Sequence, residues 1–301
     1  MGFSAGTMLA QEKMSGAQPM GDVFFVDSAS GRDGNDGSSK RRPLLTIARA
    51  VALASAGDTI LIRGTFSEAV TVTGKAGLRI IGVGSNSSEA LWQGATDTVS
   101  LTIAANANCW IENIRFRPNT YTAGVPAAIH LTGASKQTYI VNCRFQGRGG
   151  SWYAIYSDGQ SDNLHILDCE FVYNNTATYG TAIKSSGAAD LSGVVIQGNL
   201  FHSNLNDIVA PMRQSIIRNN VFASTGLLAA GSAGVTVLGI DIHGAATGLN
   251  IVTGNFIGGL YHQACYYGGT ADHWAGNYCV DRTHATQVDA TTGISILAPA
   301  A

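Results

Sequence analysis

The hydrophobic and polar positions of the chain form a degenerate repeat that begins near residue 106 and runs almost to the C-terminus. One half of the repeat places an isoleucine five residues before a phenylalanine, with polar or turn-forming residues between them. Copies of this half, looser or shorter toward the end, lie at residues 111–116, 140–145, 166–171, 196–201, 217–222, 251–256 and 274–278. A second apolar segment recurs between them, at residues 128–130, 154–156, 182–184, 207–209, 239–241 and 264–266. Self-similarity of this kind is the signature of a solenoid.

The spacing of the repeat predicts strands and not helices. The aromatic positions that end the copies are 21 to 34 residues apart, with a mean of 27. Each unit contains two or three short β-rich runs, and none has the apolar spacing of a helical face. A helical repeat of similar length needs two amphipathic helices per unit. We therefore predict an all-β fold, a single-stranded parallel β-helix whose strands stay constant while its loops change length.

Alignment of the copies stacks similar residues into columns along the solenoid axis. The expected columns are an isoleucine stack (Ile111, Ile140, Ile166, Ile196, Ile217, Ile251), a phenylalanine stack (Phe116, Phe145, Phe171, Phe201, Phe222, Phe256), a bend column (Asn113, Asn142, Asp168, Gly198, Asn219) and the column after it (Ile114, Cys143, Cys169, Asn199, Asn220). Neighbouring coils lie about 4.8 Å apart, so the first two columns would bury apolar surface continuously. The bend column contains residue types that tolerate a left-handed backbone. Inward asparagines can satisfy buried amide groups of neighbouring coils. Chance similarity within a glycine-rich β protein is the alternative interpretation.

A short helix is expected to cover the open N-terminal end of the solenoid. Apolar residues from Ile47 to Ala54 follow the spacing of one helical face. Pro43 precedes this run, and Gly57 is the expected C-cap. A solenoid end needs a cap, and a helix over about residues 44–56 would supply it.

The chain divides into three predicted parts. They are an N-terminal arm at residues 1–21, an N-terminal strand, loop and capping helix at 22–57, and a parallel β-helix at 58–301. Within the last part, the runs at 59–62 and 69–72 are expected to form the first coil, and the run at 293–297 to close the last one.

The arm differs in character from the rest of the chain. It contains four methionines, Met1, Met8, Met14 and Met20, among small and polar residues, without a β pattern. This composition is typical of a flexible segment, and methionine side chains adapt to irregular surfaces. We expect the arm to anchor the protein in a larger assembly, and a leader without a role in the folded protein is the alternative.

A family resemblance rests on the first 70 residues and the later coils. The residues that support it are Val26-Asp27-Ser28, Gly34-Asn35-Asp36-Gly37, Pro43, Thr46-Ile47, Ala50, Ala54, Gly57-Asp58-Thr59-Ile60 and Glu68. Over roughly residues 22–290 the chain resembles the pectate-lyase-like right-handed β-helices. The resemblance implies the right-handed sense of the helix. It selects no function, because that superfamily includes pectin-degrading lyases and hydrolases, bacteriophage tailspikes, virion fibre and decoration proteins, and adhesins.

Composition and cysteine usage exclude several classes of protein. The net charge is −2 and 13% of the residues are charged, which argues against nucleic-acid binding by phosphate neutralisation. No apolar run is long enough to cross a membrane, and the absence of a secretory signal argues against a secreted plant-wall enzyme. The five cysteines lack the spacing of a zinc site, and Cys143 stacked on Cys169 predicts buried free thiols. We predict no metal and no other cofactor.

The outer faces of the predicted coils contain no obvious catalytic cluster. The resemblance implies that lyases use several carboxylates with an Arg or Lys base, and that hydrolases use aspartates on neighbouring coils. The predicted outward column of the second segment is His130, Tyr156, Lys184, Val209, Asp241 and Tyr266, in which no two carboxylates are adjacent. Asp158 and Asp162 follow Tyr156 in a loop, and Glu170 is expected to form a cross-coil ion pair. We predict no catalytic residues. Asp158, Asp162, Glu170 and Asp241 are the residues to mutate first if the chain is an enzyme.

Other segments offer candidate binding or contact surfaces. The loop from Asp27 to Gly37 has the residue types of tight turns, with calcium binding as the alternative. Two aromatic groups, Trp152, Tyr153 and Tyr156 and then His262, Tyr266, Tyr267 and His273, suit either sugar stacking or a subunit contact. The run from Leu227 to Gly231 is weakly polar for a solvated loop and favours a contact surface.

Together these features predict a non-enzymatic structural protein of a virion. We expect a decoration, fibre or spike subunit of a bacteriophage-like particle, made in the host cytoplasm and anchored by its arm. Its expected partners are other virion proteins and copies of itself, with polysaccharide as a further candidate and no nucleic acid or membrane. The alternatives are a polysaccharide-degrading β-helix enzyme, such as a tailspike depolymerase or a pectate-lyase-like protein, and an extracellular carbohydrate-binding adhesin.

Overall fold

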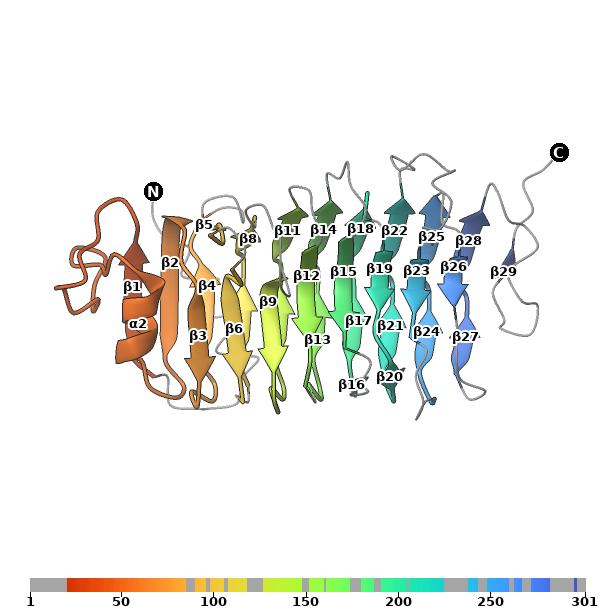
Figure 1. Ribbon diagram of the computed structural model, residues 1–301, viewed down its shortest axis with the longest axis horizontal. Helices are drawn as coiled ribbons and strands as arrows, with labels where there is room; N and C mark the ends of the chain where they lie inside the picture. Colours follow the sequence, from red (N-terminus) through yellow and green to blue (C-terminus); the bar gives the residue numbers. More distant parts are fainter. Residues whose placement is uncertain are drawn as a thin grey trace.

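The chain winds into coils that lie side by side along one long axis, and a short helix lies at the N-terminal end (Figure 1). The computed structural model describes residues 21–84, 90–95, 98–105, 108–117, 127–147, 152–159, 161–173, 180–186, 191–204, 206–224, 238–242, 248–259, 263–266, 272–281 and 295–296. Every strand pair among these residues is parallel, as a solenoid with one chain direction per face requires. The predicted parallel β-helix is therefore confirmed. No helix in the described part of the chain is long and apolar enough to cross a membrane.

Three sheets form the faces of the rod. Sheet A contains β1 (Val23–Asp27), the first half of β2 (Thr59–Phe66), β4 (Arg79–Gly82), β7 (Trp110–Glu112), β10 (Tyr139–Val141), β13 (His165–Leu167), β17 (Val195–Gln197), β21 (Ile216–Arg218), β24 (Ile251–Thr253) and β27 (His273–Ala275). Sheet B contains the second half of β2, β5 (Ala90–Trp92), β8 (Arg115–Phe116), β11 (Arg144–Gly147), β14 (Glu170–Tyr173), β18 (Leu200–His202), β22 (Val221–Ser224), β25 (Phe256–Gly259), β28 (Tyr278–Asp281) and β29 (Ser295–Ile296). Sheet C contains β3 (Val70–Thr73), β6 (Leu101–Ala104), β9 (Ala127–Thr132), β12 (Trp152–Ser157), β15 (Gly180–Ser185), β19 (Asn206–Val209), β23 (Leu238–Asp241) and β26 (Gln263–Tyr266). A short extra pair joins β16 (Leu191–Ser192) to β20 (Met212–Arg213).

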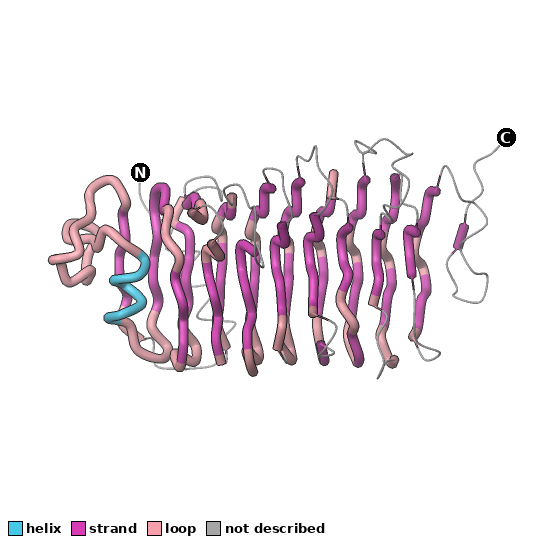
Figure 2. Tube along the Cα trace, in the orientation of Figure 1, coloured by secondary structure: helices cyan, strands magenta, loops and turns pink. Residues whose placement is uncertain are grey.

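The connections between the sheets differ in regularity (Figure 2). From β7 onward, sheet A passes to sheet B through two residues in each coil. The first of the two has a positive φ, for example 55° at Asn113, 52° at Asp168 and 70° at Gly198. This confirms the predicted bend column. The connections from sheet B to sheet C vary in length, so the variation between coils is concentrated at that edge of the rod.

The isoleucine and phenylalanine columns lie in the interior, as predicted, in the first five copies of the repeat. Ile111, Ile140, Ile166, Ile196 and Ile217 pair in register on sheet A and are fully buried. The phenylalanines of sheet B stack from Phe116 to Phe222 with ring centroids 4.7–5.2 Å apart and planes within 7° of each other. Trp92, outside the recognised repeat, extends this stack at 5.7 Å from Phe116. The core is therefore continuous along the axis.

Two residues expected in these columns lie on the surface instead. Ile251 is 42% exposed and Phe256 is 43% exposed, while Val252 and Ile257 take the interior positions. The bend of this coil is at Gly254, whose φ is 65°, and this position fixes the register. A shift of one residue sends every side chain of a strand to the opposite face. Ile251 and Phe256 have the five-residue spacing of the motif, but they lie one position before the residues that occupy the interior columns.

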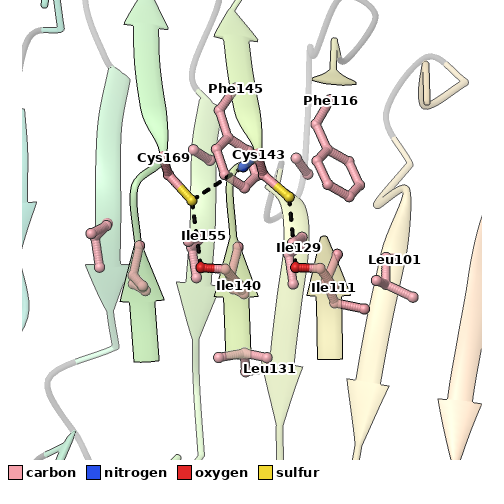
Figure 3. Packing of buried hydrophobic residues seen from close by; sticks show 14 of the residues in the cluster. Leu101, Ile111, Phe116, Ile129, Leu131, Ile140, Cys143, Phe145, Ile155 and Cys169 are labelled. Atoms are coloured by element: carbon pink, nitrogen blue, oxygen red, sulfur yellow. Dashed lines mark hydrogen bonds between the residues drawn. The ribbon is translucent and has the colours of Figure 1, made fainter. Parts of the chain in front are cut away.

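A hydrogen-bonded ladder runs through the column after the bend, and its first two members are cysteines. In later coils an asparagine side chain donates to the carbonyl of the buried residue one coil earlier: Asn199 to Ile166, Asn220 to Ile196, Asn255 to Ile217, and Asn277 to Val252. The Sγ atoms of Cys143 and Cys169 make the same contacts with Ile111 and Ile140, at 3.8 and 3.5 Å (Figure 3). The two thiols are free and buried, as predicted. Their role is not only apolar filling, because each replaces an amide in the ladder.

We expect Cys169→Asn to be tolerated and to stabilise the fold. The Cys143 amide N–H now donates to the Cys169 Sγ at 3.4 Å, and an amide Oδ1 is the stronger acceptor. Exchanging a weak thiol contact for an amide hydrogen bond is worth about 0.5–1.5 kcal/mol. Cys169→Ala is the matched control, because it removes the donor and acceptor together and should lower the unfolding midpoint. A Cys169→Asn variant less stable than Cys169→Ala would contradict the ladder.

The capping helix is shorter than predicted. Helix α2 spans Ile47–Leu53 and buries Ile47, Ala50 and Val51 over the first coil. Its C-cap is Ala54, so the expected C-cap at Gly57 is wrong; Gly57 has a φ of 84° in the turn before β2.

The N-terminus of α2 is held from two directions. The Thr46 side chain accepts from the Arg49 N–H at 3.1 Å, as a helix N-cap does. Glu68, from the loop after β2, accepts from the Ile47 and Ala48 N–H groups at 2.8 and 2.9 Å. A negative charge also suits this end of a helix, so Glu68 fixes the cap to the first coil.

Candidate functional site

The outer face of sheet C contains the largest mixed group of titratable and aromatic side chains in the described residues. His130, Tyr156, Lys184, Val209, Asp241 and Tyr266 follow one another in strand register. The predicted outward column is thereby confirmed as a column of backbone positions. We call His130, Tyr153, Tyr156, Asp158 and Lys184 the sheet C cluster.

A histidine–carboxylate pair lies at the centre of this cluster. His130 Nε2 is 2.9 Å from Asp158 Oδ2, although 28 residues separate them in sequence. The Tyr156 ring lies 5.3 Å from His130 and 5.2 Å from Tyr153. Burial, followed by the negative charge of Asp158, raises the pKa of the Tyr156 hydroxyl, so this group stays protonated at neutral pH.

Lys184 is a half-buried base of the cluster. Desolvation by burial lowers the pKa of its ammonium group, and the charge of Asp241 partly opposes that effect. The side chain pairs in register with Tyr156 on one side and Val209 on the other. A half-buried lysine beside a tyrosine has the chemistry of a proton acceptor.

The four carboxylates singled out in the sequence do not converge on one point. Asp158 pairs with His130, Asp162 lies 3.7 Å from Lys136, and Glu170 lies 3.1 Å from Arg144 and 3.3 Å from His202. Asp241 interacts electrostatically with Lys184. The predicted cross-coil ion pair of Glu170 is confirmed. Both side chains of the Arg144–Glu170 pair are about one-third exposed, so the pair contributes less than about 1 kcal/mol to the stability of the fold.

Acidic groups elsewhere serve local structure. Asp27 accepts from the Ala29 and Ser30 N–H groups, Asp33 from Leu45 and Thr46, and Asp36 from Ser38. The Ser38 hydrogen bonds lower the pKa of Asp36. The Asp27 and Asp36 contacts are those of tight turns, whereas Asp33 joins its loop to the start of α2, 12 and 13 residues later. Within the described ranges, no three His, Cys, Asp or Glu side chains lie close enough together to hold a metal ion.

A ladder of aromatic rings on the outer face of sheet A was missed in the sequence. Trp110, Tyr139 and His165 stack with centroids 4.9 and 4.4 Å apart and planes within 21° of each other. Glu112 accepts from the Trp110 indole N–H at 2.8 Å. Because the rings face one another along the axis, they present their edges outward. A sugar packs on the face of an aromatic ring, so this ladder stabilises the coils and offers little to a sugar.

Of the aromatic residues expected at the surface, some lie on the surface, one is buried and others are outside the described residues. Trp152 is buried and faces the interior, so its surface role is wrong, whereas Tyr153 and Tyr156 lie in the sheet C cluster. His273 is exposed on β27. His262, Tyr267, the run from Leu227 to Gly231 and the arm at residues 1–20 lie outside the described residues, as does the side chain of Tyr266.

Sheet B has an exposed apolar column over its last coils. Leu200, Val221, Phe256 and Tyr278 pair in register on adjacent strands, and each is 38–43% exposed. The Phe256 and Tyr278 rings stack 5.3 Å apart. We call these four residues the apolar stripe. Leu200, Val221 and Phe256 each come directly before a buried residue of the repeat, a signal that the sequence contained.

The family comparison agrees with the geometry. Residues 51–222 match the family model described as a right handed beta helix region. The match confirms the right-handed sense of the helix, and the structural neighbours below share the fold of the pectate-lyase-like proteins. Curated proteins give no significant match to the sequence.

Several enzymes are among the solved structures to which the chain is similar. They include the GH136 lacto-N-biosidase from Eubacterium ramulus (TM-score 0.62, 13% identity, 91% of this chain and 57% of that one). Pectate lyase Pel9A gives a TM-score of 0.59 at 12% identity, over 86% of this chain and 69% of that one. The PL6 family alginate lyase AlyGC gives a TM-score of 0.55 at 14% identity, over 88% of this chain and 40% of that one. The chain thus spans less than two thirds of two of these three proteins, and identities this low establish the fold alone.

Proposed function

We propose that the chain, which belongs to the right-handed β-helix family, is a non-enzymatic structural subunit of a bacteriophage-like virion. In this role the rod is a decoration, fibre or spike component that associates with copies of itself and with other virion proteins. It is made in the host cytoplasm and anchored by its N-terminal arm. Its mechanism is binding through shape and apolar contact.

The apolar stripe is the observation that supports this role most strongly. Six of the eight exposed large hydrophobic residues in the described part of the chain lie between Leu200 and Tyr278. One of them, Leu249, is 64% exposed and has a φ of 65°, which is uncommon for a leucine. Apolar surface gathered on one end of a rod favours protein contact.

Two further features support a role that does not involve catalysis. The four candidate carboxylates each interact with a basic group, and none pairs with another carboxylate in the described structure. Glycoside hydrolysis needs two carboxyl groups that act on one bond. In addition, Cys109, Cys143 and Cys169 are free thiols, as expected of a protein that folds in a reducing compartment.

We expect the double variant Val221→Asp/Phe256→Asp to lose self-association. Two charges in the middle of the stripe would have to be desolvated in any contact, which disfavours the complex by several kcal/mol. Light scattering coupled to size exclusion should give oligomers for the wild type and a monomer for the variant. Thr102→Asp, on the outer face of sheet C, is the matched control and should associate normally. A wild-type chain that stays monomeric at high concentration would contradict lateral packing through the stripe.

The proposed virion role is tested by asking whether the chain is present in purified particles. Particles purified on a density gradient from cells that make the chain should contain it in a fixed ratio to the other particle proteins. Chains that carry the double variant should be depleted from those particles relative to the Thr102→Asp control. Recovery of the wild-type chain only in the soluble fraction would refute the role.

A second candidate function is polysaccharide cleavage at the sheet C cluster. The observation in its favour is the lowered pKa of Lys184 next to Tyr156 and the His130–Asp158 pair. A lysine of this kind can remove a proton next to a carboxylate in a β-elimination. Its test is product release by the wild type that disappears in Lys184→Ala.

A further inference from the structure

Sheet A has an apolar surface of its own, in the same coils as the apolar stripe on sheet B. Three aliphatic residues of neighbouring coils pair in register on its outer face: Val195, Ile216 and Ile251. The first two are half-buried, and Ile251 is 42% exposed. Each lies five residues before a member of the stripe, with the bend between the two sheets in the interval. The two apolar surfaces therefore lie on adjoining faces of the same coils.

Leu249 enlarges the surface on sheet A. Asn250 is buried between Leu249 and Ile251, so the two flanking side chains both face outward. Leu249 has a φ of 65° and is 64% exposed. We call Val195, Ile216, Leu249 and Ile251 the aliphatic patch.

The backbone at Leu249 is one that leucine rarely adopts. Earlier coils also have a positive φ two residues before the outward residue of sheet A, but with glycine, asparagine or glutamine there: Gly77, Asn108, Gln137, Asn163, Gly193 and Gln214. Leu249 is thus unfavourable in the isolated rod twice, through its backbone conformation and through the apolar side chain that it leaves in water. Strain of this kind, at an exposed apolar residue, points to a contact outside the rod.

A second copy of the chain offers a surface that matches the aliphatic patch. If the stripe of one copy met the stripe of another, the contact would be isologous and would leave both patches in water. If the patch of one copy meets the stripe of the next, the contact is heterologous and covers both surfaces in every copy. Neither the patch nor the stripe contains a charged residue, so this contact desolvates no charge.

We propose that the aliphatic patch of one copy binds the apolar stripe of the next, and that parallel rods close into a ring. Because the patch and the stripe lie in the same coils, neighbouring copies need no shift along the rod axis. A heterologous contact closes into a ring when rotation alone relates the copies, whereas an added shift would build a filament. This inference rests on the self-association in the proposed function and adds which two surfaces meet.

Complementation between two defective chains tests the inference. The patch variant is Leu249→Asp/Ile251→Asp. Both positions are exposed, and aspartate accepts a left-handed backbone more readily than leucine, so the unfolding midpoint should not fall. We expect this variant alone to be monomeric at concentrations where the wild type forms oligomers. Mixed in equal amounts with the stripe variant Val221→Asp/Phe256→Asp, it should form a 1:1 heterodimer, because each chain keeps the surface that the other lacks.

Sedimentation velocity with one of the two chains fluorescently labelled measures the heterodimer. A chain with all four substitutions is the matched control and should bind neither variant, whereas Thr102→Asp should assemble as the wild type does. A patch variant that assembles like the wild type, or two monomeric variants that do not combine on mixing, would overturn the ring and leave association through the stripe standing. A monomeric wild type would overturn the self-association itself.

Discussion

Phe171→Ala should destabilise the rod by about 3–5 kcal/mol, the range for removing a fully buried aromatic ring. Phe171 lies in the middle of the stack, 4.9 Å from Phe145 and 4.7 Å from Phe201. Its removal opens a cavity that the neighbouring coils cannot close, because the backbone ladders fix their spacing at about 4.8 Å. The measurement is the free energy of unfolding from urea denaturation followed by circular dichroism.

Phe256→Ala is the control for this prediction. It makes the same chemical change at a ring that is 43% exposed, outside the stack. We expect a loss below about 1 kcal/mol, as for a surface substitution. Equal losses at the two positions would mean that the phenylalanine stack is not the core that holds the coils together.

Asn220→Ala should cost about 2–4 kcal/mol, because it leaves several buried polar groups without partners at about 1–3 kcal/mol each. The Asn220 Oδ1 accepts from the backbone and side-chain N–H groups of Asn199, both at 2.9 Å. Its Nδ2 donates to the Ile196 carbonyl at 3.0 Å and to the Asn255 Oδ1 at 2.9 Å. The substitution thus breaks the ladder in both directions along the axis. Urea denaturation again measures the loss.

The residue next to it provides the matched control. Asn219 is at the bend with a φ of 55°, where other coils have Gly198, Gly254 and Gly276. Asn219→Gly should change the free energy of unfolding by less than about 1 kcal/mol, since glycine adopts this conformation without strain. A larger loss for Asn219→Gly than for Asn220→Ala would place the stabilising contacts in the bend and not in the ladder.

The fold was predictable because stacking repeats the same physical requirement in each coil. An interior isoleucine, a left-handed bend and a buried phenylalanine recur at fixed offsets, so each copy supports the alignment of the others. The prediction failed where one coil matched the motif in the wrong register. In residues 251–256 the pattern was satisfied by Ile251 and Phe256, whereas the positive φ of Gly254 decides which face each residue takes.

The surface was less predictable, because its groups meet across coils through loops of variable length. The outward column of sheet C followed from the repeat, but the pairing of Asp158 with His130 depends on how the chain turns after β12. The aromatic ladder on sheet A and the apolar stripe were both available to sequence reasoning. Apart from Tyr278, each of their members comes directly before a buried residue of the repeat.

The central claim is that the outer faces of this rod bind and do not catalyse. The most direct test incubates the purified chain with a panel of neutral and acidic polysaccharides, with and without added calcium, and measures new reducing ends and unsaturated products. We predict no product above that of a heat-unfolded sample. Product release that disappears in Lys184→Ala and Asp158→Asn, but persists in Lys136→Ala, would contradict the claim.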